Sequence, residues 1–280
     1  MKIHSLNTGY FKLDGGAMFG VVPKSLWQKK NQSDSDNLCT WAMRCLLIED
    51  ENRLILVDTG MGNKQDEKFR GYYQPREQRT FEVALSSFDF HALDITDVIL
   101  SHLHFDHAGG AVQWNVDRTK FEMTFPNANY WCHSKQWQLS QNPNPREKAT
   151  FLKENLLPIF ESGHLKFIDE NQEYFKNYRM NEVFGHTEGM VLPEFEINNQ
   201  KIIFGADLFP STAHINPTWV MAYDTQPLIA ISEKAIFLER ICNDKILIVF
   251  DHDPLTECAF IEKTEKGYAI SWKGSLSEVF

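Results

Sequence analysis

The sequence lacks long apolar runs, paired cysteines and an excess of positive charge. None of its apolar runs approaches the ~18 residues that a bilayer-spanning helix needs, and its first residues show no apolar signal segment. The five cysteines are odd in number and form no CxxC pair, which predicts reduced thiols rather than a disulfide framework. The net charge of −10 argues against nucleic acid as the main partner, because that affinity comes from clustered Lys and Arg. We therefore expect a cytoplasmic protein that binds neither membranes nor nucleic acid.

What the sequence does contain is typical of a globular α/β protein with a sizeable core. Of its 280 residues, 42% are hydrophobic and 24% are charged, and no internal repeat or linker is visible. Apolar runs typical of strands alternate with segments of helical spacing, such as 81–91 and 228–241. We expect a single domain over 1–280. Within it, the helical stretch around 133–162 is the candidate for an insertion that caps a functional site.

The most informative segment is 101–110, which contains three histidines and an aspartate in close succession. It follows the apolar run 97–100, which predicts a buried strand, so its side chains lie at the carboxyl end of that strand. Three imidazoles and a carboxylate gathered there suit a borderline metal such as zinc. A polar loop with coincidental histidines is the alternative, which we disfavour because histidines rarely cluster without a ligand role.

Other strands of the prediction also end in His or Asp. Gly185-His186 follows 179–184, Asp207 follows the hairpin strand 201–204, and Asp251-His252 follows 245–250. A further strand over 53–57 ends in Asp58, which we expect to orient a ligand imidazole or stabilise its loop rather than bind metal. The strand ends together offer enough imidazoles and carboxylates for two metals. The candidate ligands are His102, His104, Asp106, His107, His186, Asp207 and His252.

These motifs resemble the metallo-β-lactamase superfamily over nearly the whole chain. The matching patterns are His-x-His-x-Asp-His at 102–107, Gly-His-Thr-x-Gly at 185–189, Gly-x-Asp at 205–207 and Asp-His at 251–252. The resemblance implies a four-layer αβ/βα sandwich with a dinuclear site at one edge. It also implies that His102, His104 and His186 hold one metal, that Asp106, His107 and His252 hold the other, and that Asp207 bridges them.

Two divalent cations in such a site favour hydrolysis. They lower the pKa of bound water toward about 7, so that a bridging hydroxide can attack a carbonyl or phosphoryl centre at neutral pH. Asp106 or a pocket hydroxyl could return a proton to the leaving group. His and carboxylate ligands suit zinc first, and manganese, cobalt and iron are also compatible.

For the substrate, segments 14–24 and 206–224 resemble quorum-quenching lactonases of this superfamily, which open N-acyl-homoserine lactones. Several of those enzymes carry a tyrosine three residues after the bridging aspartate, where this chain has Pro210, so Tyr223 or His214 is the candidate replacement. An apolar set would suit the acyl chain of a small-molecule substrate. Its members are Met18, Phe19, Val21, Trp27, Trp219 and Met221.

Several alternatives remain open. An organophosphate or aryl-ester hydrolase would use the same two-metal site, whereas a thioesterase for glutathione conjugates would need a cationic patch that is not evident. A persulfide dioxygenase would hold a single iron with fewer ligands, and a nuclease would need a basic face. A non-catalytic binding module is disfavoured because unneeded clustered polar ligands cost stability. The segment 14–24 is either a pocket wall or a hydrophobic hairpin packed on the core, and it could serve a homodimer as well.

Overall fold

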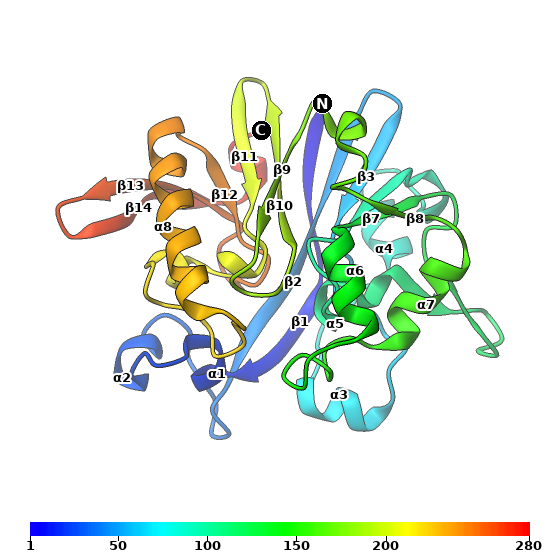
Figure 1. Ribbon diagram of the computed structural model, residues 1–280, viewed down its shortest axis with the longest axis horizontal. Helices are drawn as coiled ribbons and strands as arrows, with labels where there is room; N and C mark the ends of the chain where they lie inside the picture. The colour runs from blue at the N-terminus through cyan, green and yellow to red at the C-terminus, as the bar shows by residue number, and fades with distance from the viewer. The chain divides into compact units, whose positions relative to one another are not determined.

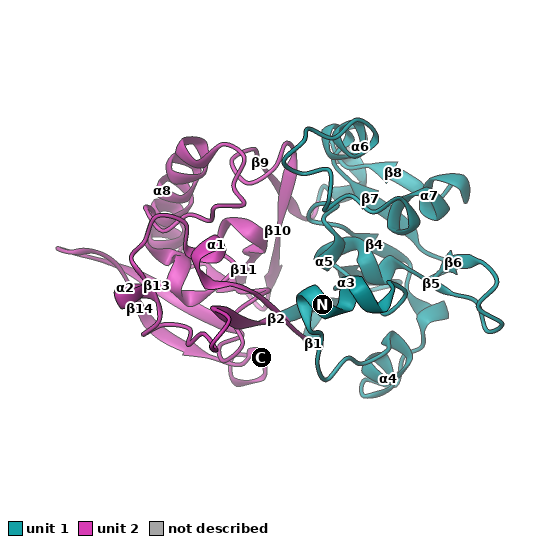
Figure 2. Cartoon of the chain, turned by 90° about the horizontal axis from the view of Figure 1, so that it is seen from below, with its two compact units in different colours: residues 1–9, 43–176 teal, residues 10–42, 177–280 magenta. Residues whose placement is uncertain are grey.

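The computed structural model describes residues 1–280, apart from the side chain of Gln172. The chain divides into two compact units (Figure 2), which we describe separately. The single domain expected over 1–280 stays a prediction. The two long strands β1 (Lys2–Asp14) and β2 (Leu38–Asp50) each have one part in either unit. Unit 1 comprises Met1–Gly9 and Met43–Lys176, and unit 2 comprises Tyr10–Ala42 and Asn177–Phe280.

A mixed sheet with the order β1-β2-β3-β4-β7-β8 organises unit 1. The predicted hairpin of β2 and β3 is confirmed, with Leu46 opposite Val57. Strands β3, β4, β7 and β8 run parallel, so their carboxyl ends meet at one edge of the sheet. The segments that follow β3 and β4, which begin at Asp58 and Leu100, therefore lie at this edge. The bounds are β3 Arg53–Val57, β4 Asp97–Ile99, β7 Asn129–Cys132 and β8 Leu165–Phe167.

Five α-helices and a small β5–β6 ribbon accompany this sheet. The helix predicted over 81–91 is shorter than expected and ends at Ser86, because the chain turns at Asp89, which has a φ of 62°. Two helices form within the predicted insertion, and the second ends three residues after Pro158. The elements are α3 Glu67–Tyr73, α4 Phe81–Ser86, α5 Phe105–Ala108, β5 Val112–Trp114, β6 Phe121–Met123, α6 Ser134–Gln141 and α7 Lys153–Glu161.

Unit 2 contains a second six-stranded sheet with the order β14-β13-β12-β11-β10-β9. β11 is parallel to β12, and β10 is antiparallel to both β9 and β11. Strands β9, β11 and β12 therefore point the same way and end at one edge, which gathers the residues that follow them. The bounds are β9 Arg179–Val183, β10 Met190–Ile197, β11 Gln200–Phe204, β12 Leu247–Val249, β13 Cys258–Thr264 and β14 Gly267–Gly274.

The long helix α8 (Pro227–Asp244) confirms the predicted helix and packs against β13 (Figure 1). The segment 14–24 is not a hairpin. It forms α1 (Gly15–Phe19) and continues into α2 (Lys24–Trp27), because the Asp14 carboxylate caps α1 by accepting from Ala17 N at 2.9 Å. The hairpin of β13 and β14 was not predicted from the sequence. Throughout the described part of the chain, no helix has the length and apolarity that a membrane crossing requires.

Candidate metal centre

Two histidines of unit 1 face each other at the end of β4. Nε2 of His102 lies 3.1 Å from Nδ1 of His104, and both side chains are buried. Two nitrogens that each lie ~2.0–2.1 Å from one tetrahedral metal are about 3.3 Å apart. The two imidazoles are therefore spaced as ligands of a shared cation. On α5, Oδ2 of Asp106 lies 3.9 Å from Nε2 of His107, so these two donors also face the same region.

Asp58 holds His107 and the turn before it. Its Oδ1 accepts from Ser101 N and its Oδ2 from Ser101 Oγ, both at 2.7 Å, and Oδ2 lies 2.8 Å from His107 Nδ1. A carboxylate on Nδ1 sets the tautomer and directs Nε2 away from itself, toward a metal position. Asp58 thus holds the His107 ring and its turn, as expected, while the role of His107 as a metal ligand stays a prediction.

The orienting carboxylate of His104 is Glu147, which the sequence analysis missed. Its Oε1 lies 3.3 Å from Nε2 of His104, and only 3% of Glu147 is exposed. Glu147 comes from the polar stretch between α6 and α7, where the sequence pattern indicates only a surface loop. In the same region, His133 is buried and caps α6 by accepting from Lys135 N at 3.1 Å.

In unit 2, Asp207 lies between two histidines. Its Oδ2 is 3.1 Å from Nε2 of His186, and its Oδ1 is 3.2 Å from Nε2 of His252. Each oxygen of this carboxylate thus faces a different imidazole. This is the arrangement expected of a carboxylate that bridges two cations, one beside each histidine.

The other ring nitrogen of each histidine has its own acceptor. Nδ1 of His186 lies 2.9 Å from Asp224 Oδ1, and Nδ1 of His252 lies 2.7 Å from the carbonyl oxygen of Ala42. Both contacts turn Nε2 toward Asp207. Burial lowers the pKa of His186, but the carboxylates of Asp207 and Asp224 outweigh it and raise that pKa to about 10. The surroundings of His186 therefore favour a positive charge.

Helix α8 holds the turn that carries His186. Glu233 of α8 accepts from Phe184 N at 2.7 Å and from Gly185 N at 3.0 Å. A Cβ at Gly185 would lie 2.3 Å from the backbone nitrogen of Ala230, so only glycine permits this approach. The glycine before His186 is therefore required by packing against α8.

A third carboxylate, Asp251, belongs to the same group in unit 2. Donor atoms of Asp207, Asp251 and His252 lie within 4.8 Å of one another, and all three residues are buried. Nitrogen and carboxylate donors at this spacing fit a divalent cation in both units. The donor chemistry thus agrees with the metal sites predicted from the sequence.

The expected substrate residues of unit 2 occupy different environments. Phe19 stacks on Trp27 and on His214, with ring centroids 5.2 and 5.0 Å apart, and Trp219 meets Phe19 edge-on at 6.0 Å. Met18 and Met221 are buried as well, whereas Val21 is 92% exposed. Phe19, Trp27 and Trp219 therefore form one aromatic cluster, and Val21 lies in solvent.

His214 and Tyr223 also differ in their surroundings. Nδ1 of His214 lies 2.7 Å from Ser211 Oγ, and its Nε2 lies 2.8 Å from the carbonyl oxygen of Met18. Burial and the Lys234 ammonium lower the pKa of His214 to about 3, so the ring is neutral at neutral pH. Tyr223 is 38% exposed. His214 thus links the α1 segment to the η5 turn (Thr212–Ile215).

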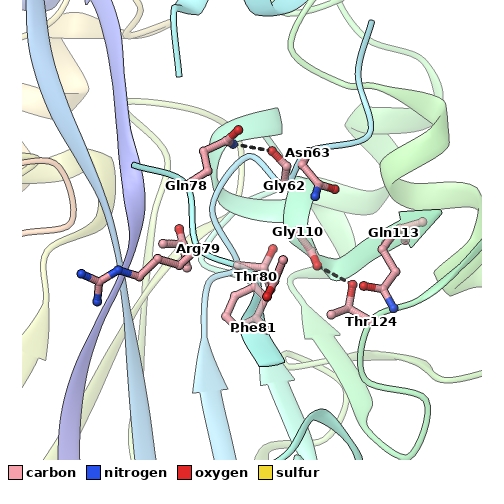
Figure 3. Close-up of a pocket in the computed structure, with 12 residues that line it drawn as sticks. Gly62, Asn63, Gln78, Arg79, Thr80, Phe81, Gly110, Gln113 and Thr124 are labelled. Carbon is pink, nitrogen blue, oxygen red and sulfur yellow. Dashed lines mark hydrogen bonds between the residues drawn. The ribbon is translucent and has the colours of Figure 1, made fainter. Parts of the chain in front are cut away.

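A small cavity lies in unit 1, and Figure 3 shows the residues that line it. Its volume is about 70 Å³, and Thr59 and Gly110 are among its lining residues. Substrate pockets usually have volumes of ~300–1,000 Å³, so this cavity suits a few water molecules rather than an acyl lactone. None of the residues expected to contact substrate lines it.

Comparisons with known proteins show the family of the chain. Residues 44–118 match the family described as the metallo-beta-lactamase superfamily. A probable metal-dependent hydrolase from Staphylococcus aureus is similar in structure, with a TM-score of 0.88 and 30% identity, covering 98% of this chain and 96% of that chain. The chain therefore belongs to the metallo-β-lactamase superfamily. The predicted α/β metallo-β-lactamase fold is confirmed.

Two lactonases are also similar to this chain. An N-acyl homoserine lactonase from Bacillus sp is 25% identical over 222 residues, which cover 75% of this chain and 80% of the relative. The dizinc quorum-quenching lactonase AidC, solved with a product, has a TM-score of 0.78 at 23% identity, covering 98% and 95% of the two chains.

Proposed function

We propose that this protein is a dinuclear metal-dependent hydrolase that opens the ring of N-acyl homoserine lactones. The observation that carries the two-metal part is the position of Asp207, whose two oxygens face His186 and His252. The lactone part is supported by the names of the similar Bacillus enzyme and of AidC, which is itself described as dizinc.

The ligand assignment follows the superfamily pattern. In this proposal His102, His104 and His186 hold one cation, while Asp106, His107 and His252 hold the other. Asp207 contacts both. Asp58, Glu147 and Asp224 support the proposal, because each holds the opposite nitrogen of a ligand imidazole and so orients it.

The chain's own residues would position the reaction and move its proton. When bound, divalent cations lower the pKa of water toward about 7 and stabilise negative charge that develops on oxygen. Asp106, in the first turn of α5 and 9% exposed, would accept the proton that the attacking water releases and pass it to the leaving alkoxide when the lactone ring opens. Trp219, which is partly exposed and meets the buried Phe19 edge-on, would offer an apolar surface to an acyl chain.

The proposal is tested by metal analysis combined with a panel of substrates. The purified protein is expected to contain about two divalent cations per chain, and zinc, manganese, cobalt and iron should each be measured. Acyl-homoserine lactones of several chain lengths, aryl esters, thioesters and phosphotriesters are then compared by kcat/KM. Faster turnover of a phosphotriester or thioester than of any lactone would overturn the lactone assignment. A single iron together with oxygen consumption would identify a dioxygenase instead.

A further inference from the structure

We propose that Asp251 is an additional ligand for the cation beside His252, an inference that rests on the two-metal function proposed above. The superfamily pattern carried by this sequence assigns His252 and Asp207 at this position and leaves Asp251 without a role. Asp251 nonetheless lies in the same group of donors. With it, the position has two carboxylates and an imidazole from unit 2 alone.

The geometry of His252 points to this role. The carbonyl oxygen of Ala42 engages Nδ1 of His252 at 2.7 Å and so fixes the ring. Nε2 then lies 3.2 Å from Oδ1 of Asp207 and 3.7 Å from Oδ2 of Asp251. One imidazole nitrogen is therefore flanked by an oxygen from each carboxylate, as three ligands of one cation would be.

Burial strengthens the argument. Asp251 and His252 are 1% and 2% exposed, and Asp207 is 8% exposed. Two carboxylates this close together and this deeply buried repel each other unless a positive charge lies between them. A divalent cation held by both carboxylates supplies that charge.

The neighbouring Asp253 shows what a purely structural aspartate looks like in this turn. Its Oδ1 accepts from Leu255 N and Thr256 N, at 3.0 and 2.8 Å. Its Oδ2 accepts from the backbone nitrogen and the hydroxyl of Thr212. Asp251 differs, because its Oδ1 accepts from His252 N at 3.0 Å while its Oδ2 faces the ligand imidazole.

Asp251 as a ligand would affect which metal the position beside His252 prefers. An extra carboxylate adds negative charge and a hard oxygen donor, which favours manganese or iron over zinc more than a histidine-rich site does. Asp251→Asn keeps the shape of the side chain and an oxygen that can accept from His252 N, and it removes the charge. We expect D251N to bind its second manganese ion at least about tenfold more weakly, with a smaller loss for zinc.

The experiment titrates metal-free wild type, D251N and D253N with manganese and with zinc, using a competing chelator, and records cobalt absorption spectra. D251N is expected to lose affinity for one of two cations and to change the cobalt spectrum, whereas D253N keeps both. Metal-free D251N should unfold at the same or a higher temperature than metal-free wild type, because it relieves the repulsion between Asp251 and Asp207. D253N should unfold at a lower temperature.

Two outcomes would overturn the proposal. One is a D251N variant that binds both cations with wild-type affinity and an unchanged cobalt spectrum. The other is a metal-free D251N that is less stable than wild type and binds metal normally, which would make Asp251 a turn-capping residue. The lactonase function is judged separately, by whether the wild type with two cations opens lactones.

Discussion

Oδ1 of Asp224 lies 2.9 Å from Nδ1 of His186, while Oδ2 of the same carboxylate accepts from Met221 N at 2.9 Å. One aspartate thus joins a candidate metal ligand to the loop that carries the expected acyl-chain contacts. Helix α8 contacts both the turn before His186 and this loop. Its Glu233 accepts from Phe184 N, and its Lys234 donates to the carbonyl oxygen of Trp219. Metal binding and the substrate loop therefore depend on the same helix.

Asp224→Asn should weaken the cation held by His186. The amide is a poorer acceptor for the Nδ1 proton and cannot serve both His186 and Met221 with acceptor oxygens. We expect a 10- to 100-fold loss of metal affinity, by analogy with other residues that orient metal-bound histidines. Chelator competition measures it. Asp244→Asn, on an exposed ion pair at the end of α8, is the control and should leave affinity unchanged. Equal affinities in the two variants would contradict the orienting role.

Glu147→Gln tests the carboxylate that was not evident from the sequence. Loss of the charge beside Nε2 of His104 should lower the basicity of the imidazole and reduce metal affinity by about tenfold. The exposed Glu161→Gln in the same helical region serves as the matched variant. If E147Q retained full metal content after dialysis against a chelator, Glu147 would have only a packing role.

Asp207→Ala should abolish the two-metal centre. Removal of a carboxylate that contacts both histidines leaves each cation with one ligand fewer, so we expect metal content to fall from about two per chain to one or none. Lactone hydrolysis should fall at least about a hundredfold. Elemental analysis and kcat/KM measure these effects. Two retained cations with full turnover would exclude Asp207 as a bridging ligand.

Lys234 predicts a specific pH dependence of stability. Burial lowers its pKa from 10.5 to about 7, so between these values the unfolded chain binds more protons than the folded one. The free energy of unfolding contributed by this group therefore rises with pH from about 7 to about 10.5, by up to about 1.4 kcal/mol per pH unit. Lys234→Met removes that slope. Urea unfolding of both proteins at pH 7 and 9 should show the free energy of unfolding of the wild type rising relative to that of K234M, and a constant difference would contradict the lowered pKa of Lys234.

Gly185→Ala should destabilise the protein, because the added methyl group would lie 2.3 Å from backbone atoms of Ala230. We expect a loss of about 1–3 kcal/mol, since α8 or the His186 turn must move. Gly71→Ala in α3 is the control, because nothing lies within 4 Å of a Cβ there, and it should be neutral or stabilising by up to about 1 kcal/mol. Thermal unfolding compares them, and similar effects of both variants would argue against the packing constraint.

Many elements and candidate ligands could be predicted because their signals are local. The strand 97–100 and the histidines after it lie within the segment 97–107, and His186, Asp207 and His252 each follow their own apolar run. The residues that orient these ligands could not be predicted. Glu147 and Asp224 come from loops 43 and 38 residues from their partners. A polar loop residue carries no pattern that distinguishes a buried acceptor from a surface charge.

In segment 14–24, too, the sequence predicts some features and leaves others to the tertiary structure. Its apolar residues were visible, but alternation and glycine content left a hairpin and a pocket wall equally open. The helix cap at Asp14 and the stacking of Phe19 on His214 decide its conformation, and they leave Val21 in solvent.

The sequence by itself determined the types of donor atoms and their places at strand ends, because short-range apolar periodicity defines where each strand stops. Tertiary structure alone decided which nitrogen of each imidazole is held and by which acceptor, and it placed Asp251 beside His252 and Asp207. Those contacts depend on strand order and helix packing within each unit, which join segments that are distant in the chain and leave no mark in local sequence.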